Sequence, residues 1–128
     1  MKRILVCGSR SKDHEHLVEA ELDRQLAASP AGIRLIHGGN SGVAAVANAW
    51  AWGRRALGGG VEVSSFPLVG EETRAPRRFR TRNVRMLKQS RPQLVLAFPG
   101  DEESEHLVAI ARIQGIPVVE FAEGALVS

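Results

Sequence analysis

The sequence predicts an α/β domain, a doubly wound parallel sheet of about five strands between two layers of helices. Five short apolar runs are spaced along the 128 residues, and a helical pattern of apolar residues follows each of the first four. Near-continuous apolar runs are typical of strands buried on both faces, as in a parallel sheet. Their alternation with helices is the pattern of an open α/β sheet. We therefore expect one three-layer α/β/α domain over residues 1–128.

The predicted strands are residues 3–7, 33–37, 61–66, 94–98 and 117–121. A glycine or a proline directly follows each of the first four, and these residue types end extended segments. Apolar residues at helical spacing predict helices about residues 18–26, 42–57, 79–87 and 107–114. Gly115 and Pro117 end the last of these helices. Residues 68–76 have no regular pattern, and we expect a loop there.

The composition limits the class of protein. A mass of 13.9 kDa with 44% apolar residues is ordinary for one folded domain. The single cysteine, Cys7, excludes a disulfide framework and a cysteine-rich zinc site. No apolar run approaches the roughly 18 residues of a membrane span, and the apolar start of the chain is too short for a signal peptide. We therefore expect a cytoplasmic protein with no membrane partner.

Basic residues are concentrated in one segment, residues 74–91, which holds eight of them and no acidic residue. The rest of the chain has nine basic and 14 acidic residues, a net charge of −5. A positive segment on a weakly acidic body indicates an anionic partner, which is a nucleotide, a phosphate or a nucleic acid. The alternative for each single arginine is a solvated helix face.

Three predicted strands end in glycine-containing turns, and ligands of doubly wound sheets bind outside the carboxyl ends of the strands. Glycine allows a ligand to approach the backbone closely. A helix N-terminus beyond each turn offers free N–H groups that favour phosphate. The predicted ligand-binding residues in these turns are Gly8, Ser9, Arg10, His37, Gly38, Gly39, Asn40, Ser41, Gly42, Pro99, Gly100 and Asp101. The alternative is that they form only turns and helix caps.

The turn after the second strand does not have the spacing of a known phosphate loop. It lacks the lysine of the P-loop pattern and the three-glycine spacing of the dinucleotide fingerprint. This disfavours a conventional kinase, GTPase or NAD-dependent dehydrogenase. His37, at the end of the strand, is interpreted as an acid–base group or a ribose ligand, with a packed strand terminus as the alternative.

The third predicted helix places two polar side chains at its apolar face. Phe79, Asn83, Met86 and Leu87 share one face, and Arg82 flanks it. An unpaired buried amide costs roughly 1–3 kcal/mol, so this Arg-Asn pair needs inward partners such as backbone carbonyls, carboxylates or a ligand. We therefore add Arg82 and Asn83 to the predicted ligand-binding residues. The neighbouring arginines that we expect to face solvent are Arg77, Arg78 and Arg85.

Four segments together resemble the SLOG superfamily of Rossmann-like nucleotide-binding domains. They are Gly-Ser-Arg at 8–10, His-Gly-Gly-x-x-Gly at 37–42, Arg-Asn-x-x-Met-Leu at 82–87, and the strand ending in Phe-Pro-Gly at 94–100. The superfamily includes DNA-processing protein A and the cytokinin-activating phosphoribohydrolases, and the most similar branch is the YspA-type small proteins. The resemblance, over about residues 3–121, implies a Rossmann-like sheet of order 3-2-1-4-5. It also implies a nucleotide-derived ligand, such as a nucleoside monophosphate, NAD or an ADP-ribose derivative.

The turn after the fourth strand departs from the superfamily pattern. That pattern reads Pro-Gly-Gly-x-Gly-Thr, with a glutamate three residues later in the hydrolases. This chain reads Pro-Gly-Asp-Glu-Glu-Ser at 99–104, and Leu107 occupies the position of the hydrolase glutamate. The resemblance implies that Arg82 corresponds to the hydrolase arginine. If the protein hydrolyses N-glycosidic bonds, the catalytic candidates are Arg82 with Asp101 or Glu102 in place of the glutamate.

Four carboxylates, Asp101, Glu102, Glu103 and Glu105, stand at the start of the fourth predicted helix. The helix dipole favours each by about 0.3–1 kcal/mol, but they compete with a phosphate for the same N–H groups. Three roles remain for these carboxylates: ion pairs with residues 74–91, a hydrogen bond to a ribose hydroxyl, or binding of Mg²⁺. For Glu103 and Glu105 we favour a capped, solvated helix start, and Asp101 is either a cap or a ligand contact. No other metal or cofactor is predicted.

The helix at residues 42–57 has a second apolar stripe, roughly opposite Trp50, which consists of Ala45, Ala49, Trp52 and Ala56. A helix that is apolar on two sides is usually buried on two sides. We therefore expect a homodimer through this helix, with Trp52 as an anchor because tryptophan is enriched at interface hot spots.

Two classes of function remain, a module for a nucleotide-like small molecule and a nucleic-acid-binding protein that uses residues 74–91. The chain has no tyrosine and four phenylalanines, so stacking platforms for single strands are few. The negative charge outside residues 74–91 disfavours binding around a duplex. The small molecule is therefore the favoured interpretation.

Overall fold

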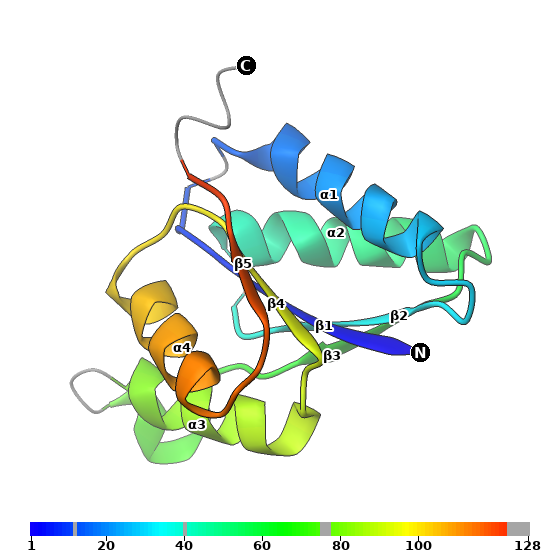
Figure 1. Cartoon of the computed structure of the whole chain (residues 1–128). Coiled ribbons are helices and arrows are strands. Elements are labelled where there is room, and N and C mark those ends of the chain that lie inside the picture. Colours follow the sequence, from blue (N-terminus) through cyan, green and yellow to red (C-terminus); the bar gives the residue numbers. More distant parts are fainter. Residues whose placement is uncertain (12, 40, 75–77, 123–128) are drawn as a thin grey trace.

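The computed structural model describes residues 1–11, 13–39, 41–74 and 78–122. The chain alternates strands and helices in the expected order (Figure 1). The elements are β1 (Lys2–Cys7), α1 (Glu15–Ala27), β2 (Ile33–His37), α2 (Gly42–Ala56), β3 (Val61–Ser65), the 3₁₀ helix η1 (Gly70–Thr73), α3 (Phe79–Ser90), β4 (Leu94–Ala97), α4 (Glu102–Ile113) and β5 (Val118–Glu120). The segment expected to be a loop thus contains η1, and its residues 75 and 76 lie outside the described residues.

The five strands form one parallel sheet in the order β3-β2-β1-β4-β5, which confirms the predicted fold class and strand order. Leu5 of β1 pairs in register with Ile36 of β2 on one side and with Val95 of β4 on the other. The chain builds outward from β1 to β3 and then crosses to β4. The carboxyl ends of β1 and β4 therefore mark the topological switch point, where sheets of this class bind ligands.

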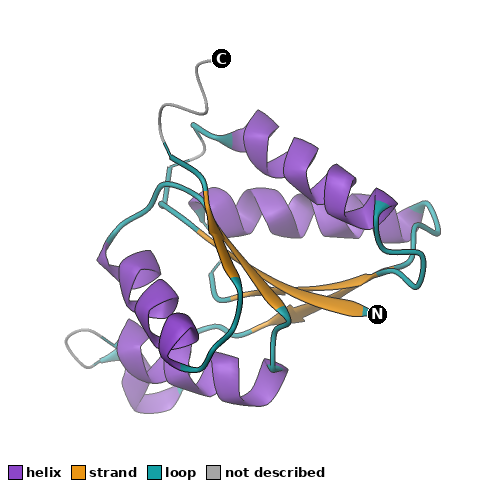
Figure 2. Ribbon diagram, in the orientation of Figure 1, coloured by secondary structure: helices purple, strands orange, loops and turns teal. Residues whose placement is uncertain are grey.

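Two helices cover each face of the sheet, with α1 and α2 on one side and α3 and α4 on the other (Figures 1 and 2). Residues of β1 alternate between these layers. Ile4 and Val6 belong to the core under α1 and α2, whereas Leu5 and Cys7 belong to the core under α3 and α4. Each such buried aliphatic side chain contributes roughly 1.5–3 kcal/mol. Among the described residues, no helix has the length and apolar character that crossing a membrane requires.

Candidate functional site

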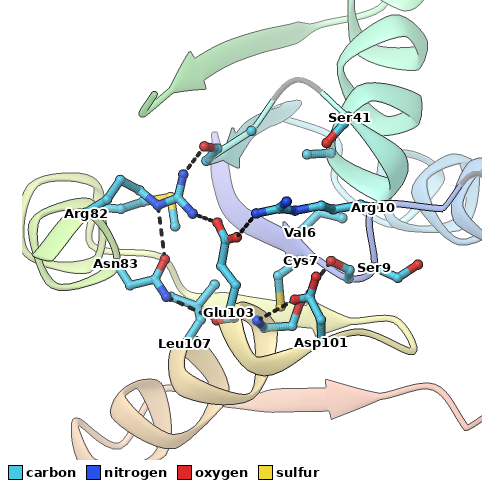
Figure 3. A pocket seen from close by; sticks show the side chains of 16 residues that line it. Val6, Cys7, Ser9, Arg10, Ser41, Arg82, Asn83, Asp101, Glu103 and Leu107 are labelled. Carbon is cyan, nitrogen blue, oxygen red and sulfur yellow. Dashed lines mark hydrogen bonds and ion pairs between the residues drawn. The ribbon is translucent and has the colours of Figure 1, made fainter. Parts of the chain in front are cut away.

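A cavity of about 70 Å³ lies at the carboxyl ends of β1 and β4, and we call it the switch-point cavity (Figure 3). It is formed by the turn after β1, the turn after β2, the face of α3 and the first turn of α4. The polar and glycine residues that line it are Gly8, Ser9, Arg10, Gly38, Gly39, Ser41, Arg82, Asn83, Asp101, Glu103 and Ser104. Side chains from four separated segments therefore meet at one point.

Other residues of the predicted ligand set lie beside this cavity without lining it. Gly42 has a φ of +58°, and a Cβ there would overlap the Ser9 carbonyl, so glycine lets the first two turns pack together. The carbonyl of Pro99 accepts a 2.9 Å hydrogen bond from the Ser9 amide. At Gly100 a Cβ would lie 2.6 Å from the Ser104 Oγ. These residues build the turns, while Asn40 lies outside the described residues.

Arg82 is held on α3 by a buried stripe that includes Met86 and Leu87, and its own side chain is 4% exposed. Its Nη1 donates to the carbonyls of Gly38 and Phe66, and its Nη2 forms an ion pair with Glu103. Burial lowers the pKa of this guanidinium, but arginine remains charged in proteins. The protein therefore keeps a buried cation at the inner end of the cavity.

Asn83 supports this arrangement from the same face of α3. Its Oδ1 accepts a 3.1 Å hydrogen bond from Arg82 Nε, and its Nδ2 donates to the backbone carbonyl of Glu103 at 3.1 Å. The Nδ2 also lies 3.1 Å from Nδ1 of His106. The buried Asn83 amide therefore has the hydrogen-bond partners that we expected from the sequence. It joins α3 to α4, and its polar atoms are already engaged there.

Glu103 is the site residue that the sequence did not assign, since a solvated helix start was favoured there. One carboxylate oxygen pairs with Arg82, and the other lies 3.6 Å from Nη2 of Arg10 (Figure 3). The side chain is 27% exposed. Leu107, at the hydrolase glutamate's position, follows it by four residues and lines the same cavity. Residues four apart share a helix face. The carboxylate that pairs with Arg82 therefore lies on the same face of α4 as Leu107, one turn before it.

Asp101 is the N-cap of α4. Its side chain accepts a 3.3 Å hydrogen bond from the Ser104 amide, and the Ser104 hydroxyl donates to the Gly8 carbonyl at 2.9 Å. Asp101 therefore occupies the Ser104 N–H in the first turn of α4, and the Ser104 hydroxyl ties this helix to the turn after β1. Glu102, the third catalytic candidate, is exposed and does not line the cavity.

His37 lies on the opposite side of the sheet edge from Arg82. Ile33 and Leu35 belong to the core under α1 and α2, and the alternation of β2 places His37 on that face. Its Nε2 is 2.9 Å from Oδ1 of Asn48 on α2. Burial lowers the pKa of the imidazole, so the ring is neutral near pH 7.

The acidic residues that the structure describes do not gather into a metal site. Within the part of the chain that the structure describes, no group of three or more histidine, cysteine, aspartate or glutamate side chains has an arrangement that could hold a metal ion. Glu103 faces two arginines and Asp101 caps α4. Mg²⁺ at this turn therefore stays a prediction that these contacts do not favour.

The basic segment is partly engaged within the protein. Arg82 is buried, and Arg85 pairs with Glu72 of η1 and donates to the Pro67 carbonyl at 2.8 Å. The expectation that Arg85 faces solvent was therefore wrong, because η1 supplies a carboxylate to it. Arg78 is exposed as expected, and Arg77 lies outside the described residues.

The outward face of α2 has the expected stripe. Trp52 is 52% exposed, and the Arg55 guanidinium lies 5.3 Å from the centre of its ring. Ala49 and Ala56 are also exposed, whereas Trp50 is buried and donates a 2.8 Å hydrogen bond to Asp23. A homodimer through this face remains a prediction.

The order of the sheet and a polar cavity at its switch point define a Rossmann-like α/β domain. The chain belongs to the YspA, cpYpsA-related SLOG family, whose sequence profile matches residues 2–66. This confirms the resemblance to the SLOG superfamily. It is also 32% identical over 126 residues to the Gene 61 protein of Mycobacterium phage D29, across 96% of this chain and 98% of that protein.

Among solved structures, the chain is similar to the crystal structure of UDP-GlcNAc 2-epimerase from Neisseria meningitidis bound to UDP-GlcNAc. The TM-score is 0.56 with 17% sequence identity. The match covers 94% of this chain and 32% of the epimerase chain, so this protein spans about a third of the enzyme. The likeness shows the shared fold.

Proposed function

We propose that this protein binds a nucleotide or nucleotide-derived ligand, such as a nucleoside monophosphate, NAD or an ADP-ribose derivative, with a phosphate group in the switch-point cavity. One observation carries the proposal. Two guanidinium groups, from Arg82 and Arg10, converge on a single carboxylate between the turns after β1 and β2. Arginine is favoured wherever a phosphate or carboxylate is recognised by paired hydrogen bonds. The Glu103 carboxylate therefore occupies an anion position that a phosphate also fits.

The N-termini of the two helices at the cavity differ in a way that favours this placement. In α4 the Asp101 side chain caps the first turn. In α2 the N-cap residue Ser41 makes no side-chain cap hydrogen bond, and both Ser41 and Ala44 line the cavity. The Val43 amide of α2 donates to the Ser9 carbonyl at 3.0 Å, but no described side chain caps this end of the dipole, which favours a phosphate there. A phosphate near α2, Arg10 and Arg82 avoids the carboxylate of Asp101.

The volume of the cavity implies that Glu103 competes with the ligand. Sites for small organic ligands hold roughly 300–1,000 Å³, whereas the switch-point cavity holds about 70 Å³. Rotation of the Glu103 side chain toward solvent would free both guanidinium groups and enlarge the cavity. The Arg10 side chain is 71% exposed and can follow a bound phosphate. We therefore interpret the Arg10–Glu103–Arg82 contact as the closed state of the site.

Substitution of Arg10 tests the proposal without disturbing the core, because this side chain is largely exposed. Calorimetric titration with AMP, NAD and ADP-ribose should show binding of at least one, and Arg10→Gln should weaken it about tenfold, as loss of a charge-assisted hydrogen bond implies. Lys88→Gln, which removes an exposed charge from α3, is the matched control and should bind like the wild type.

Two outcomes of that titration would reject the proposal. One is equal affinity of the Arg10→Gln and Lys88→Gln proteins for every nucleotide that binds. The other is absence of nucleotide binding together with DNA binding that falls steeply with salt. The second outcome would favour the nucleic-acid alternative through residues 74–91, although two arginines of that segment are engaged within the protein.

Hydrolysis of an N-glycosidic bond is a second candidate function, and the Arg82–Glu103 pair favours it. A carboxylate and a guanidinium face one cavity, where the first stabilises a developing oxocarbenium ion and the second a phosphate or leaving group. Asp101 is engaged as a helix cap, so we propose Glu103 for the carboxylate role, which requires that it stay in the cavity when the substrate binds. Incubation with AMP and NAD should release free base, and Glu103→Gln should abolish the release. If neither substrate yields free base, this candidate is wrong.

A further inference from the structure

A second cavity, of about 320 Å³, adjoins the switch-point cavity, and we call it the Trp52 cavity. It lies at the carboxyl ends of β2 and β3, against α2, and its other lining side chains include His37, Asn48 and Ser65. Gly38 and Gly39 line both cavities. The turn after β2 is therefore a shared wall between the two spaces.

The polar groups of the Trp52 cavity have unused hydrogen-bonding capacity. Oδ1 of Asn48 is an acceptor, so Nε2 of His37 must be the donor in their 2.9 Å contact. Nδ1 of the neutral ring is then an acceptor, and it is buried without a hydrogen-bond partner among the described residues. No described residue accepts a hydrogen bond from the Asn48 amide nitrogen. The His37–Asn48 pair thus fixes the orientation of an amide donor at the cavity.

Trp52 adds an aromatic surface to the same cavity. It follows Asn48 by four residues, so the two side chains share one face of α2. Trp52 is 52% exposed, and the Arg55 guanidinium lies 5.3 Å from the centre of its ring. A half-exposed tryptophan at the rim of a cavity, beside a cation, suits a flat ring that carries hydrogen-bonding atoms.

We infer that the Trp52 cavity is a subsite for the base of the ligand, in which a heteroaromatic ring stacks on Trp52 and accepts a hydrogen bond from the Asn48 amide. The inference rests on the proposed function, because it assumes that the phosphate of the same ligand lies in the switch-point cavity. The volume of about 320 Å³ is within the range of small-ligand sites, roughly 300–1,000 Å³, unlike that of the switch-point cavity alone. Gly38 and Gly39 line both cavities, so a nucleotide that occupies both would pass over this turn, where no side chain projects. A purine has the larger stacking surface and is preferred.

The experiment compares two probes that differ only by the base, AMP and ribose 5-phosphate, in calorimetric titrations. The wild type should bind AMP about tenfold more tightly than ribose 5-phosphate, as expected for one stacked base. Trp52→Ala should remove most of this preference and leave the affinity for ribose 5-phosphate unchanged. Asn48→Ala should reduce the preference less. Leu57→Ala, an 80% exposed apolar side chain just beyond α2, is the matched control and should behave like the wild type.

Three other results of these titrations would reject the base subsite. If both probes bind equally and Trp52→Ala changes neither affinity, the phosphate site stands and the base subsite is wrong. If Trp52→Ala instead changes only self-association, measured by light scattering on the same samples, Trp52 is an interface residue and the subsite is again wrong. If neither AMP nor ribose 5-phosphate binds, the base subsite is wrong, and if NAD and ADP-ribose also fail to bind, the proposed function fails as well. Thermal melting of each variant separates a lost contact from a lost fold.

Discussion

Replacement of Glu103 with glutamine tests whether this side chain competes with a bound phosphate. The variant keeps the size of the side chain and removes its charge, so Arg82 and Arg10 lose the anion that now pairs with them. A site that closes on its own carboxylate must release that carboxylate before a phosphate enters. In the Glu103→Gln variant no ion pair has to be broken first, so the variant should bind phosphate more tightly than the wild type.

The size of the effect follows from the two ion pairs. Two unit charges about 4 Å apart attract by about 4 kcal/mol at an effective dielectric constant near 20. The pair with Arg10 adds about 0–1 kcal/mol because that side chain is 71% exposed. Hydration of the released carboxylate offsets much of this attraction, so the net cost of opening is about 1–3 kcal/mol, similar to hydrogen bonds to charged groups. Glu103→Gln should therefore bind a phosphate probe about 5- to 150-fold more tightly.

The assay is calorimetric titration with ribose 5-phosphate, combined with thermal melting. Without ligand the variant should melt several degrees lower than the wild type, because Arg82 is left buried without a counter-charge. Ligand should raise its melting temperature more than that of the wild type. Glu105→Gln, which removes an exposed charge from the same helix, is the control. If Glu103→Gln binds no more tightly than Glu105→Gln, the competition does not exist and the Arg82–Glu103 pair is structural.

Four further predictions concern the frame of the site and its assembly. Gly38→Ala should abolish phosphate binding and lower the unfolding free energy by about 1–3 kcal/mol, because the new Cβ would lie 2.7 Å from the Arg82 guanidinium. Gly39→Ala, whose Cβ would have its nearest neighbour at 3.7 Å, should melt like the wild type. Asn83→Ala should cost about 1–3 kcal/mol in chemical denaturation, because it leaves Arg82 Nε without its partner and removes the side-chain contact between α3 and α4. Burial raises the pKa of the Cys7 thiol from 9.0 to about 12, so the folded state keeps a proton that the unfolded chain loses. Stability should therefore fall as the pH rises from about 9 toward 12, and a thiol reagent at pH 8 should label Cys7 only after unfolding. A homodimer through α2, the alternative role for Trp52 to the base subsite, predicts twice the 13.9 kDa chain mass in light scattering, and a monomer at high concentration would reject it.

The fold could be predicted from the sequence because the patterns that mark each strand and helix are local. Each buried strand is an apolar run ended by glycine or proline, and the structure places the strand boundaries within about a residue of the predicted ones. The resemblance to the SLOG superfamily supplied the strand order, which local patterns do not determine. The convergence of the turns after β1, β2 and β4 then follows from the geometry of parallel strands, whose carboxyl ends share one edge.

The identity of the carboxylate at Arg82 did not follow, because it depends on how α3 and α4 dock. Matching along the sequence identified Leu107, whereas the side chain that meets Arg82 begins one turn earlier on α4. The signal was present in the spacing, since residues 103 and 107 share a helix face. The same applies to Arg85, whose partner Glu72 comes from a segment without a regular pattern.

The face of the sheet on which His37 lies was also not predicted from the sequence. Its place at a strand end put it in the predicted ligand set with Gly38 and Gly39, but the alternation of β2 turns it toward α2 and Asn48. The two-residue period from Ile33 and Leu35 indicates this face. A count along the strand would have separated the residues of the switch-point cavity from those of the Trp52 cavity.

The most direct test of the central claim is a crystal structure of the protein grown with AMP. We predict a phosphate between the guanidinium groups of Arg82 and Arg10, beside the turns at Gly8 and Gly38, with the Glu103 carboxylate turned toward solvent. A structure in which AMP binds elsewhere while the Arg82–Glu103 pair stays intact would contradict the account.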